Sequence, residues 1–289
     1  MPSVDIQGRK LYFEIHDQTG AAESVASAGS AAGSPEGDAP RLPLLLIMGT
    51  GGSCRGWLPL QVPDFSKRHP TVIFDHRGVG SSDDCEKAFT TADLAEDTVC
   101  LLDALGIAKA HVLGAFMGGM VAQEMALLHP ARIERLILVG TFARPDAKRR
   151  MLLEDWASLA RSGVSLESMV RKRLLWTLQD ETLEQTDLIE TMVEFFTRES
   201  APLSPDLFAR QCEACIAHDT TDRLRNISNE TLVLCGRHDQ LTPPKFHREL
   251  ADEIPNAHLV TISYGAHLVM AESAQRFNEI VLRFLGNKR

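Results

Sequence analysis

The segment Ala110–Met120 has the pattern of a tight turn that presents a nucleophile to a substrate. Its sequence, AHVLGAFMGGM, runs from an apolar, β-branched stretch through glycines into a long apolar stretch, which is the strand–turn–helix setting of a G-x-S-x-G motif. Gly114 and Gly118 stand at the glycine positions, where small residues let the strand and the helix come close together. Phe116 stands at the central position, so the predicted nucleophile position carries a benzyl group, with no lone pair to attack and no proton to give.

Apolar runs typical of strands buried on both faces predict the sheet that would carry this turn. Helical patterns lie between the runs, so we predict an α/β fold with a mostly parallel sheet and helices on both faces. Val4–Ile15 predicts two further short strands around a Gln7-Gly8 turn. The predicted sheet strands are 42–48, 71–74, 110–113, 136–139, 231–234 and 258–262, and the predicted helices are 94–105, 117–128, 245–253 and 274–285.

One long stretch, 145–225, interrupts this alternation with helical patterns and no clear strand. We predict that it is a helical cap, inserted between segments 1–144 and 226–289 of a single α/β core. Large apolar side chains such as Trp156 and Trp176 recur in the cap at helical spacing. They either pack the insertion onto the core or form the roof of a pocket, and both can hold at once.

Composition and charge argue against several classes of function. The chain of 289 residues has a net charge of −9, which disfavours nucleic acid or an anionic membrane as a partner. No apolar run approaches the roughly 20 residues that cross a bilayer, and no signal-peptide pattern opens the chain, so we expect a cytoplasmic protein. Segment 18–40, rich in Ala, Gly and Ser, is expected to be a flexible loop. Because the Cys212-x-x-Cys215 pair has no second ligand pair, we expect no metal site, and we expect no cofactor.

Four further motifs follow the order found in one large family. They are MGTGGS at Met48–Ser53, FDHRGVGSSD at Phe74–Asp83, LVLCGRHDQLTPP at Leu232–Pro244 and GAHLVMAE at Gly265–Glu272. With these motifs the chain resembles α/β-hydrolases of the lactonase and esterase type, and it is similar to enol-lactone hydrolases and proline iminopeptidase-like proteins. The resemblance covers nearly the whole chain apart from segment 18–40.

The resemblance implies a role for several of these residues. Asp239 would be the acid and His267 the histidine of a catalytic triad, in the chain order expected for this fold. In a triad the imidazole takes the proton of a serine hydroxyl, and the carboxylate orients the ring and stabilises its cation. Two backbone N–H groups, implied to be those of Met117 and Thr50, would hold the oxyanion. We expect Asp239 and His267 within roughly 2.6–3.2 Å of each other, although an aspartate after a strand also serves often as a turn or cap residue.

The resemblance also suggests which residues surround a substrate. Gly49, beside the implied oxyanion donor, would line the pocket, and Trp156 and Trp176 of the cap would complete it.

Other nucleophiles near these motifs have simpler interpretations. We assign Ser81 and Ser82 to hydrogen bonds that hold the turn after the fourth sheet strand. We assign Cys54 to packing beside Trp57.

Three functions stay open for a chain with this combination of residues. The first is a variant of an ester or lactone hydrolase that lacks its serine, with weak or absent hydrolysis. The second is an enzyme that uses His267 and Asp239 as a general base without a serine, of the lyase, cyclase or cofactor-free oxygenase type. The third is a non-catalytic protein that binds a small molecule. In each case the expected partner is a small-molecule substrate or ligand, and a homodimer is an open alternative.

Overall fold

The computed structural model of the protein describes residues 2–18, 41–84, 86–199 and 203–286. Within these ranges eight strands form one open sheet in the order β1-β2-β4-β3-β5-β6-β7-β8. The first two pairings, β1 with β2 and β2 with β4, are antiparallel, and the remaining pairings are parallel. The mostly parallel sheet predicted from the sequence is therefore confirmed. The strands are β1 (Ser3–Ile6), β2 (Arg9–His16), β3 (Leu44–Ile47), β4 (Thr71–Phe74), β5 (Ala110–Ala115), β6 (Ile133–Val139), β7 (Glu230–Gly236) and β8 (Ala257–Ile262).

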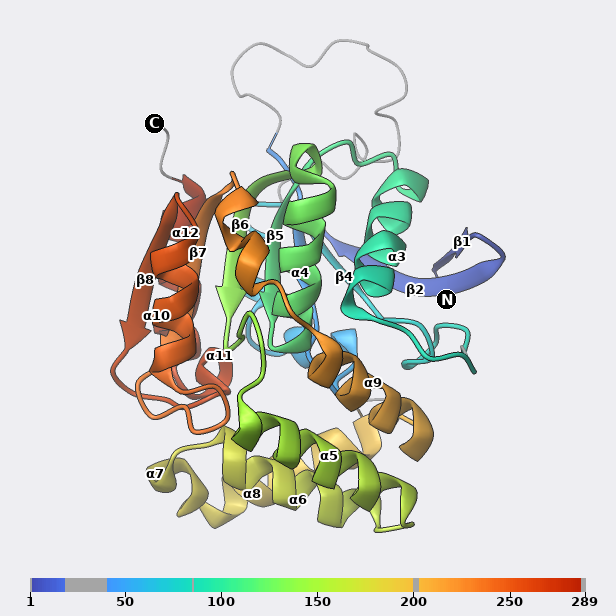
Figure 1. The fold of residues 1–289 in the computed structure, drawn as a ribbon, viewed down its shortest axis with the longest axis vertical. Helices are drawn as coiled ribbons and strands as arrows, with labels where there is room; N and C mark the ends of the chain where they lie inside the picture. The colour runs from blue at the N-terminus through green and yellow to red at the C-terminus, as the bar shows by residue number, and fades with distance from the viewer. Residues whose placement is uncertain (1, 19–40, 85, 200–202, 287–289) are drawn as a thin grey trace.

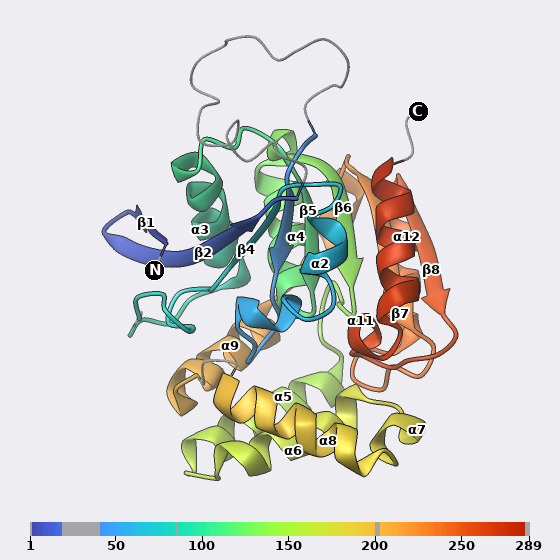
Figure 2. The same ribbon diagram turned by 180° about the vertical axis from the view of Figure 1, so that it is seen from behind.

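Helices cover both faces of the sheet, as predicted (Figures 1 and 2). On one face lie α3 (Thr91–Ala104), α4 (Met117–Leu128) and α10 (Pro244–Glu253), and on the other lie α2 (Val62–Phe65) and α12 (Ala274–Gly286). A separate apolar cluster joins each layer of helices to the sheet. The short connecting elements are η1 (Cys54–Trp57), η2 (Pro130–Arg132) and α11 (Val269–Glu272).

Strand β6 begins three residues earlier than its apolar run suggests. Glu134 and Arg135 break the apolar pattern, yet they belong to the strand. Arg135 is buried because its guanidinium lies 5.3 Å from the centre of the Phe284 ring and pairs with Glu230 at 3.2 Å. A charged side chain with an aromatic and an acidic partner can therefore occupy a strand position that hydropathy alone excludes.

Between β6 and β7 the described residues form helices and no strand. This insertion lies beyond the carboxyl ends of the parallel strands (Figure 1). Of the predicted flexible loop 18–40, all but residue 18 lies outside the described residues. None of the described helices is long and apolar enough to cross a membrane. The helices of the insertion are α5 (Ala147–Arg161), α6 (Leu166–Thr177), α7 (Asp180–Leu183), α8 (Thr186–Glu194), η3 (Phe195–Glu199), α9 (Pro205–Ala217) and η4 (Thr221–Asn226).

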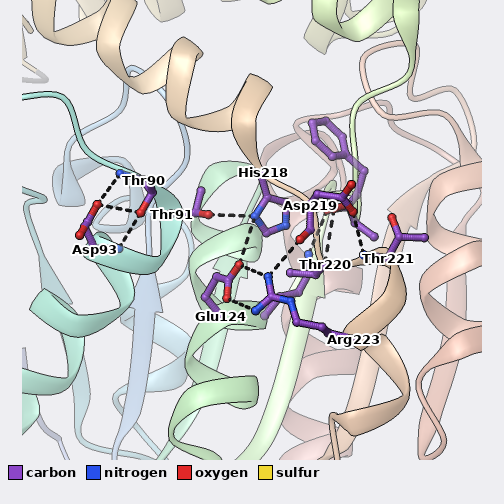
Figure 3. Close-up of polar contacts among 12 residues, drawn as sticks. Thr90, Thr91, Asp93, Glu124, His218, Asp219, Thr220, Thr221 and Arg223 are labelled. Carbon is purple, nitrogen blue, oxygen red and sulfur yellow. Dashed lines mark hydrogen bonds and ion pairs between the residues drawn. The ribbon is translucent and has the colours of Figure 1, made fainter.

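A buried polar cluster ties the end of the insertion to the core (Figure 3). His218, at the C-terminus of α9, shares a hydrogen bond of 2.9 Å between its Nδ1 and Oγ1 of Thr91 on α3. Arg223 donates two hydrogen bonds, of 2.9 and 2.7 Å, to the carboxylate of Glu124 on α4. Burial lowers the pKa of His218 to about 3, so its ring stays neutral in the folded protein.

Several buried histidines make folding stability depend on pH. Burial lowers the pKa of each ring from 6.5 to about 4 or below, whereas the unfolded chain takes up these protons below pH 6.5. The unfolded state therefore binds more protons between these values, and the free energy of unfolding falls as the pH falls. Each ring contributes up to about 1.4 kcal/mol per pH unit. The histidines are His76, His111, His218 and His247.

Urea unfolding at a series of pH values would measure how steeply the free energy of unfolding changes with pH. His111→Leu should reduce this slope by the contribution of one ring, which is up to about 1.4 kcal/mol per pH unit. A free energy of unfolding that does not change between about pH 7 and about pH 5 would contradict the prediction.

Candidate active site

The turn between β5 and α4 has a strained backbone at its centre. Phe116 has φ 47° and ψ −110°, a conformation that bulky side chains rarely adopt. Its neighbours hold it there: its N–H donates to the carbonyl of Val139 at 2.9 Å, and its carbonyl accepts from Gly119 N and Thr141 Oγ1, both at 2.9 Å. Such a conformation persists only where the surrounding structure enforces it, which makes this turn a candidate for function.

Close backbone packing explains the glycines on either side of this turn. A Cβ atom on Gly114 would lie 2.1 Å from the carbonyl oxygen of Gly118, and one on Gly118 would lie 2.1 Å from that of Ile47. A Cβ on Gly49 would lie 2.9 Å from the carbonyl oxygen of Ala115. The start of α4 is thus pressed against the ends of β3 and β5, and only glycine fits between them.

The loops after β7 and β8 bring Asp239 and His267 together. Nδ1 of His267 lies 2.9 Å from Oδ2 of Asp239, which is within the distance expected from the sequence. Thr242 donates to the same carboxylate twice, from its N–H to Oδ1 and from its hydroxyl to Oδ2, both at 2.7 Å. The carboxylate is therefore held in place by its own loop and can fix the orientation of the imidazole.

Opposing effects set the charge of Asp239. Its almost complete burial would raise the pKa, but the charge and hydrogen bond of His267 and the hydroxyl of Thr242 hold the pKa below its ordinary value. Asp239 is therefore ionised at neutral pH. Nearby His247 accepts a hydrogen bond from the N–H of Thr141 at 3.2 Å, and burial lowers the pKa of its ring to about 4.

The ring of Phe116 packs against the imidazole of His267. The two ring centres are 5.3 Å apart with an angle of 81° between the planes, and Phe142 makes a similar contact with Phe116 at 5.9 Å. Phe116 is 6% exposed. Of the two imidazole nitrogens, only Nδ1 has a hydrogen-bond partner among the described residues, and His267 lines a cavity. His267 therefore keeps a free nitrogen beside an aromatic ring.

A cavity of about 150 Å³ lies between the sheet edge and the insertion. Its lining includes Gly49, Thr50, Phe116, Trp156 and His267, all of them singled out from the sequence. The side chain of Met117 is buried and is not among the side chains that line the cavity, and its N–H, at the first position of α4, has no partner within the helix.

Trp176 does not line this cavity, which corrects the expectation from the sequence. Val170, Arg173, Leu174 and Thr177 provide the cavity face of α6. The Trp176 ring lies on another side of the helix, where Nζ of Lys148 is 5.1 Å from its centre. Helical spacing showed that Trp176 is partly buried but could not show on which side of a helix with two buried faces it lies.

The sequence analysis overlooked Arg173. Its Nη2 donates to the carbonyl of Thr50 at 2.7 Å, and its guanidinium lies 5.2 Å from the centre of the Phe208 ring. The available signal was its spacing: Arg173 is the last of three consecutive basic residues, and it stands three positions after Val170 and next to Leu174, on the apolar side of a helical pattern.

Ser82 and Cys54, which the sequence analysis assigned to structural roles, are both buried. Oγ of Ser82 donates to the carbonyl of Asp75 at 2.7 Å and accepts from the N–H of Tyr12 at 2.9 Å. Cys54 is fully buried, and burial raises the pKa of its thiol.

Cys212 and Cys215 are free and buried on α9, and Sγ of Cys215 lies 3.4 Å from Oγ1 of Thr50. Across the described ranges no three His, Cys, Asp or Glu side chains are grouped so as to hold a metal ion.

Comparison with known proteins places this geometry in context. The family described as alpha/beta hydrolase fold matches residues 43–274. The "Putative non-heme bromoperoxidase BpoC" of Mycobacterium tuberculosis is 33% identical over 251 residues, which cover 85% of this chain and 94% of the relative. The "Putative carbamate hydrolase RutD" of Caulobacter vibrioides is 31% identical over 249 residues, covering 84% and 89%. The crystal structure of the enol-lactonase from Burkholderia xenovorans is similar with a TM-score of 0.82 and 26% identity, covering 99% of this chain and all of that one.

The packing at the turn predicts that Gly118→Ala destabilises the fold. The added methyl group meets the backbone of Ile47, which cannot move without disturbing β3, so we expect a loss of about 2 kcal/mol or more in the free energy of unfolding. Gly286→Ala is a matched control because nothing lies within 4 Å of its Cβ position, and we expect a change within about 0.5 kcal/mol. Denaturant unfolding of both variants measures the difference, and equal stabilities would contradict the packing argument.

Proposed function

The chain belongs to the alpha/beta hydrolase fold family. From this premise we propose that it descends from serine hydrolases that act on esters and lactones, and that Phe116 stands at the position of their nucleophile. On this proposal Asp239 and His267 are retained from the catalytic triad, and hydrolysis by this chain is weak or absent. One observation carries the proposal: Phe116 has a positive φ at a glycine-flanked turn and packs directly on the imidazole of His267.

The geometry around Phe116 supports this assignment. In a serine hydrolase the central residue of the turn faces the free nitrogen of the histidine, which takes the proton of the hydroxyl. Here the benzyl group of the central residue contacts the imidazole ring of His267 and lines the same cavity. It can form no acyl intermediate. The backbone N–H groups of Met117 and Thr50 remain candidates for the oxyanion hole, because Met117 begins a helix and Thr50 lines the cavity.

A second function is favoured by the state of His267. The ring is oriented by an ionised carboxylate, its Nε2 has no hydrogen-bond partner among the described residues, and His267 lines the cavity. A histidine in this arrangement can remove a proton from an acidic C–H or O–H of a ligand without forming a covalent intermediate. The alternative proposal is therefore an enzyme of the lyase, cyclase or cofactor-free oxygenase type that uses His267 as general base.

Restoring the hydroxyl tests the first proposal. We expect Phe116→Ser to hydrolyse activated short-chain esters such as p-nitrophenyl butyrate at least about 10³-fold faster than Phe116→Ala, because the serine adds an acylation route to whatever the oxyanion donors provide. The measurement is steady-state hydrolysis, together with labelling of the serine by a fluorophosphonate probe. The matched control is the double variant Phe116→Ser, His267→Ala, which should fall back to the rate of Phe116→Ala. A folded Phe116→Ser protein that neither reacts with the probe nor hydrolyses the ester would sink the proposal.

Replacing His267 tests the alternative. A screen by thermal shift identifies small molecules that bind the folded protein, and mass spectrometry then follows whether each one is converted. If His267 is a general base, His267→Ala should lower turnover by about 10²–10⁴-fold, while Phe116→Leu should retain it. Turnover that survives His267→Ala would exclude this function, and binding without conversion by the unaltered protein would favour a binding role.

A further inference from the structure

We propose that the cavity selects organic anions, with an apolar body and one carboxylate, and that Arg173 binds the carboxylate. The inference rests on the proposed function in that it names the class of small molecule that the same cavity takes. The inference follows from the surroundings of Arg173 on α6, which differ from those of Arg171 on the same helix.

Arg173 is held in place without being neutralised. The carbonyl of Thr50 accepts from its Nη2, and the ring of Phe208 lies beneath the guanidinium. Both contacts fix the position of the side chain, but neither carries a negative charge. No acidic side chain in the described part of the chain forms an ion pair with it. Arg171, two residues earlier on the same helix, has two acidic partners: Glu167 at 3.0 Å and Glu190 at 2.6 Å.

Arg173 is partly buried, so its guanidinium has lost part of its contact with water and the missing counter-charge is costly. An arginine stays protonated in proteins, and removing its charge from water costs free energy that only a nearby anion recovers well. Burial also lowers the pKa of Arg173, which reflects the same penalty on the cation. The penalty is relieved if a carboxylate enters and accepts hydrogen bonds from the remaining guanidinium N–H groups.

The rest of the cavity lining suits an apolar body. Most lining side chains are aliphatic, aromatic or methionine, and among the described residues that line it no aspartate or glutamate occurs. Asp239 lies behind His267 and is already satisfied by that ring and by Thr242. Arg173 is therefore the one lining side chain with a permanent charge within the described ranges.

A second cavity places the guanidinium between two apolar spaces. It has a volume of about 140 Å³ and shares Val170, Arg173 and Phe196 with the cavity at His267. Its other lining residues include Met169, Leu203 and Phe208. A carboxylate on Arg173 would thus have apolar space on either side, which favours acids with a hydrocarbon chain or ring over small polar acids such as acetate.

The test compares acids with amides of the same shape. Isothermal titration of the unaltered protein at neutral pH uses 3-phenylpropanoate against 3-phenylpropanamide, and hexanoate against hexanamide. We expect the acid of at least one pair to bind about tenfold or more tightly than its amide, as charge-assisted hydrogen bonds require. Arg173→Gln should abolish this preference. Arg171→Gln, which removes the same charge from the surface of the same helix, should retain it.

Every outcome decides for or against the proposal. Equal binding of acid and amide, tighter binding of the amide, or no binding of either acid would overturn it, and so would a preference that survives Arg173→Gln. If circular dichroism shows that Arg173→Gln is unfolded, Arg173→Lys is used: it keeps the charge and loses the fork of donors, so we expect a reduced preference for the acid and unchanged affinity for the amide. A lysine variant that retains the full preference would overturn the assignment to Arg173.

The two proposals fail separately. The test of Phe116→Ser uses a neutral ester and needs no contact with Arg173. Hydrolysis by that variant without any preference for acids would overturn only the inference about Arg173. A clear preference for acids with an inactive Phe116→Ser variant would overturn only the proposed lineage.

Discussion

The close approach of the start of α4 to the ends of β3 and β5 is the constraint on which the site depends. Gly114 and Gly118 permit this approach, since a methyl group on either would lie 2.1 Å from a backbone oxygen. The approach forces the strained backbone at Phe116 and leaves the N–H of Met117 at the first position of a helix. Whatever side chain stands at position 116 must therefore project towards His267 and the cavity.

This constraint explains how the fold accommodates phenylalanine where a small polar side chain would fit. The ring cannot turn back into the sheet, so it fills space at the cavity wall and contacts His267 and Phe142 edge to face. Edge-to-face aromatic contacts are worth about 0.5–1.5 kcal/mol beyond the area they bury, which offsets part of the backbone strain of about 1–3 kcal/mol. The turn thus keeps its shape while its chemistry changes, because the glycines and not the central side chain determine that shape.

The features that the sequence predicted correctly are those with a local physical cause. Apolar runs form buried strands because both faces of the sheet are covered, and a G-x-x-x-G turn can be predicted because only glycine fits. The wrong or missing predictions concern side chains whose surroundings depend on tertiary contacts. Trp176 was assigned to the cavity because helical spacing marks it as buried, but α6 has more than one buried side. Arg135 shortened a predicted strand, and Arg173 was overlooked, because in each case tertiary contacts with distant residues admit a charge into an apolar segment. Spacing can mark such a charge as lying on an apolar face, as it does for Arg173, but it does not identify the distant partner that admits it.

The cavity belongs to the insertion as much as to the core. The carbonyl of Thr50 accepts from Arg173, and the N–H of Gly51 donates to Gln211 of α9 at 2.8 Å, so two helices of the insertion hold this loop of the core. On the opposite side, the N–H of Leu268, next to His267, donates to the carbonyl of Thr177 at the end of α6 at 2.9 Å. The loops that flank the cavity are therefore hydrogen-bonded to one helix, α6, which also carries Arg173. A shift of α6 would move Thr50, His267 and Arg173 together. The insertion therefore determines the geometry of the cavity as much as the carboxyl ends of the strands do.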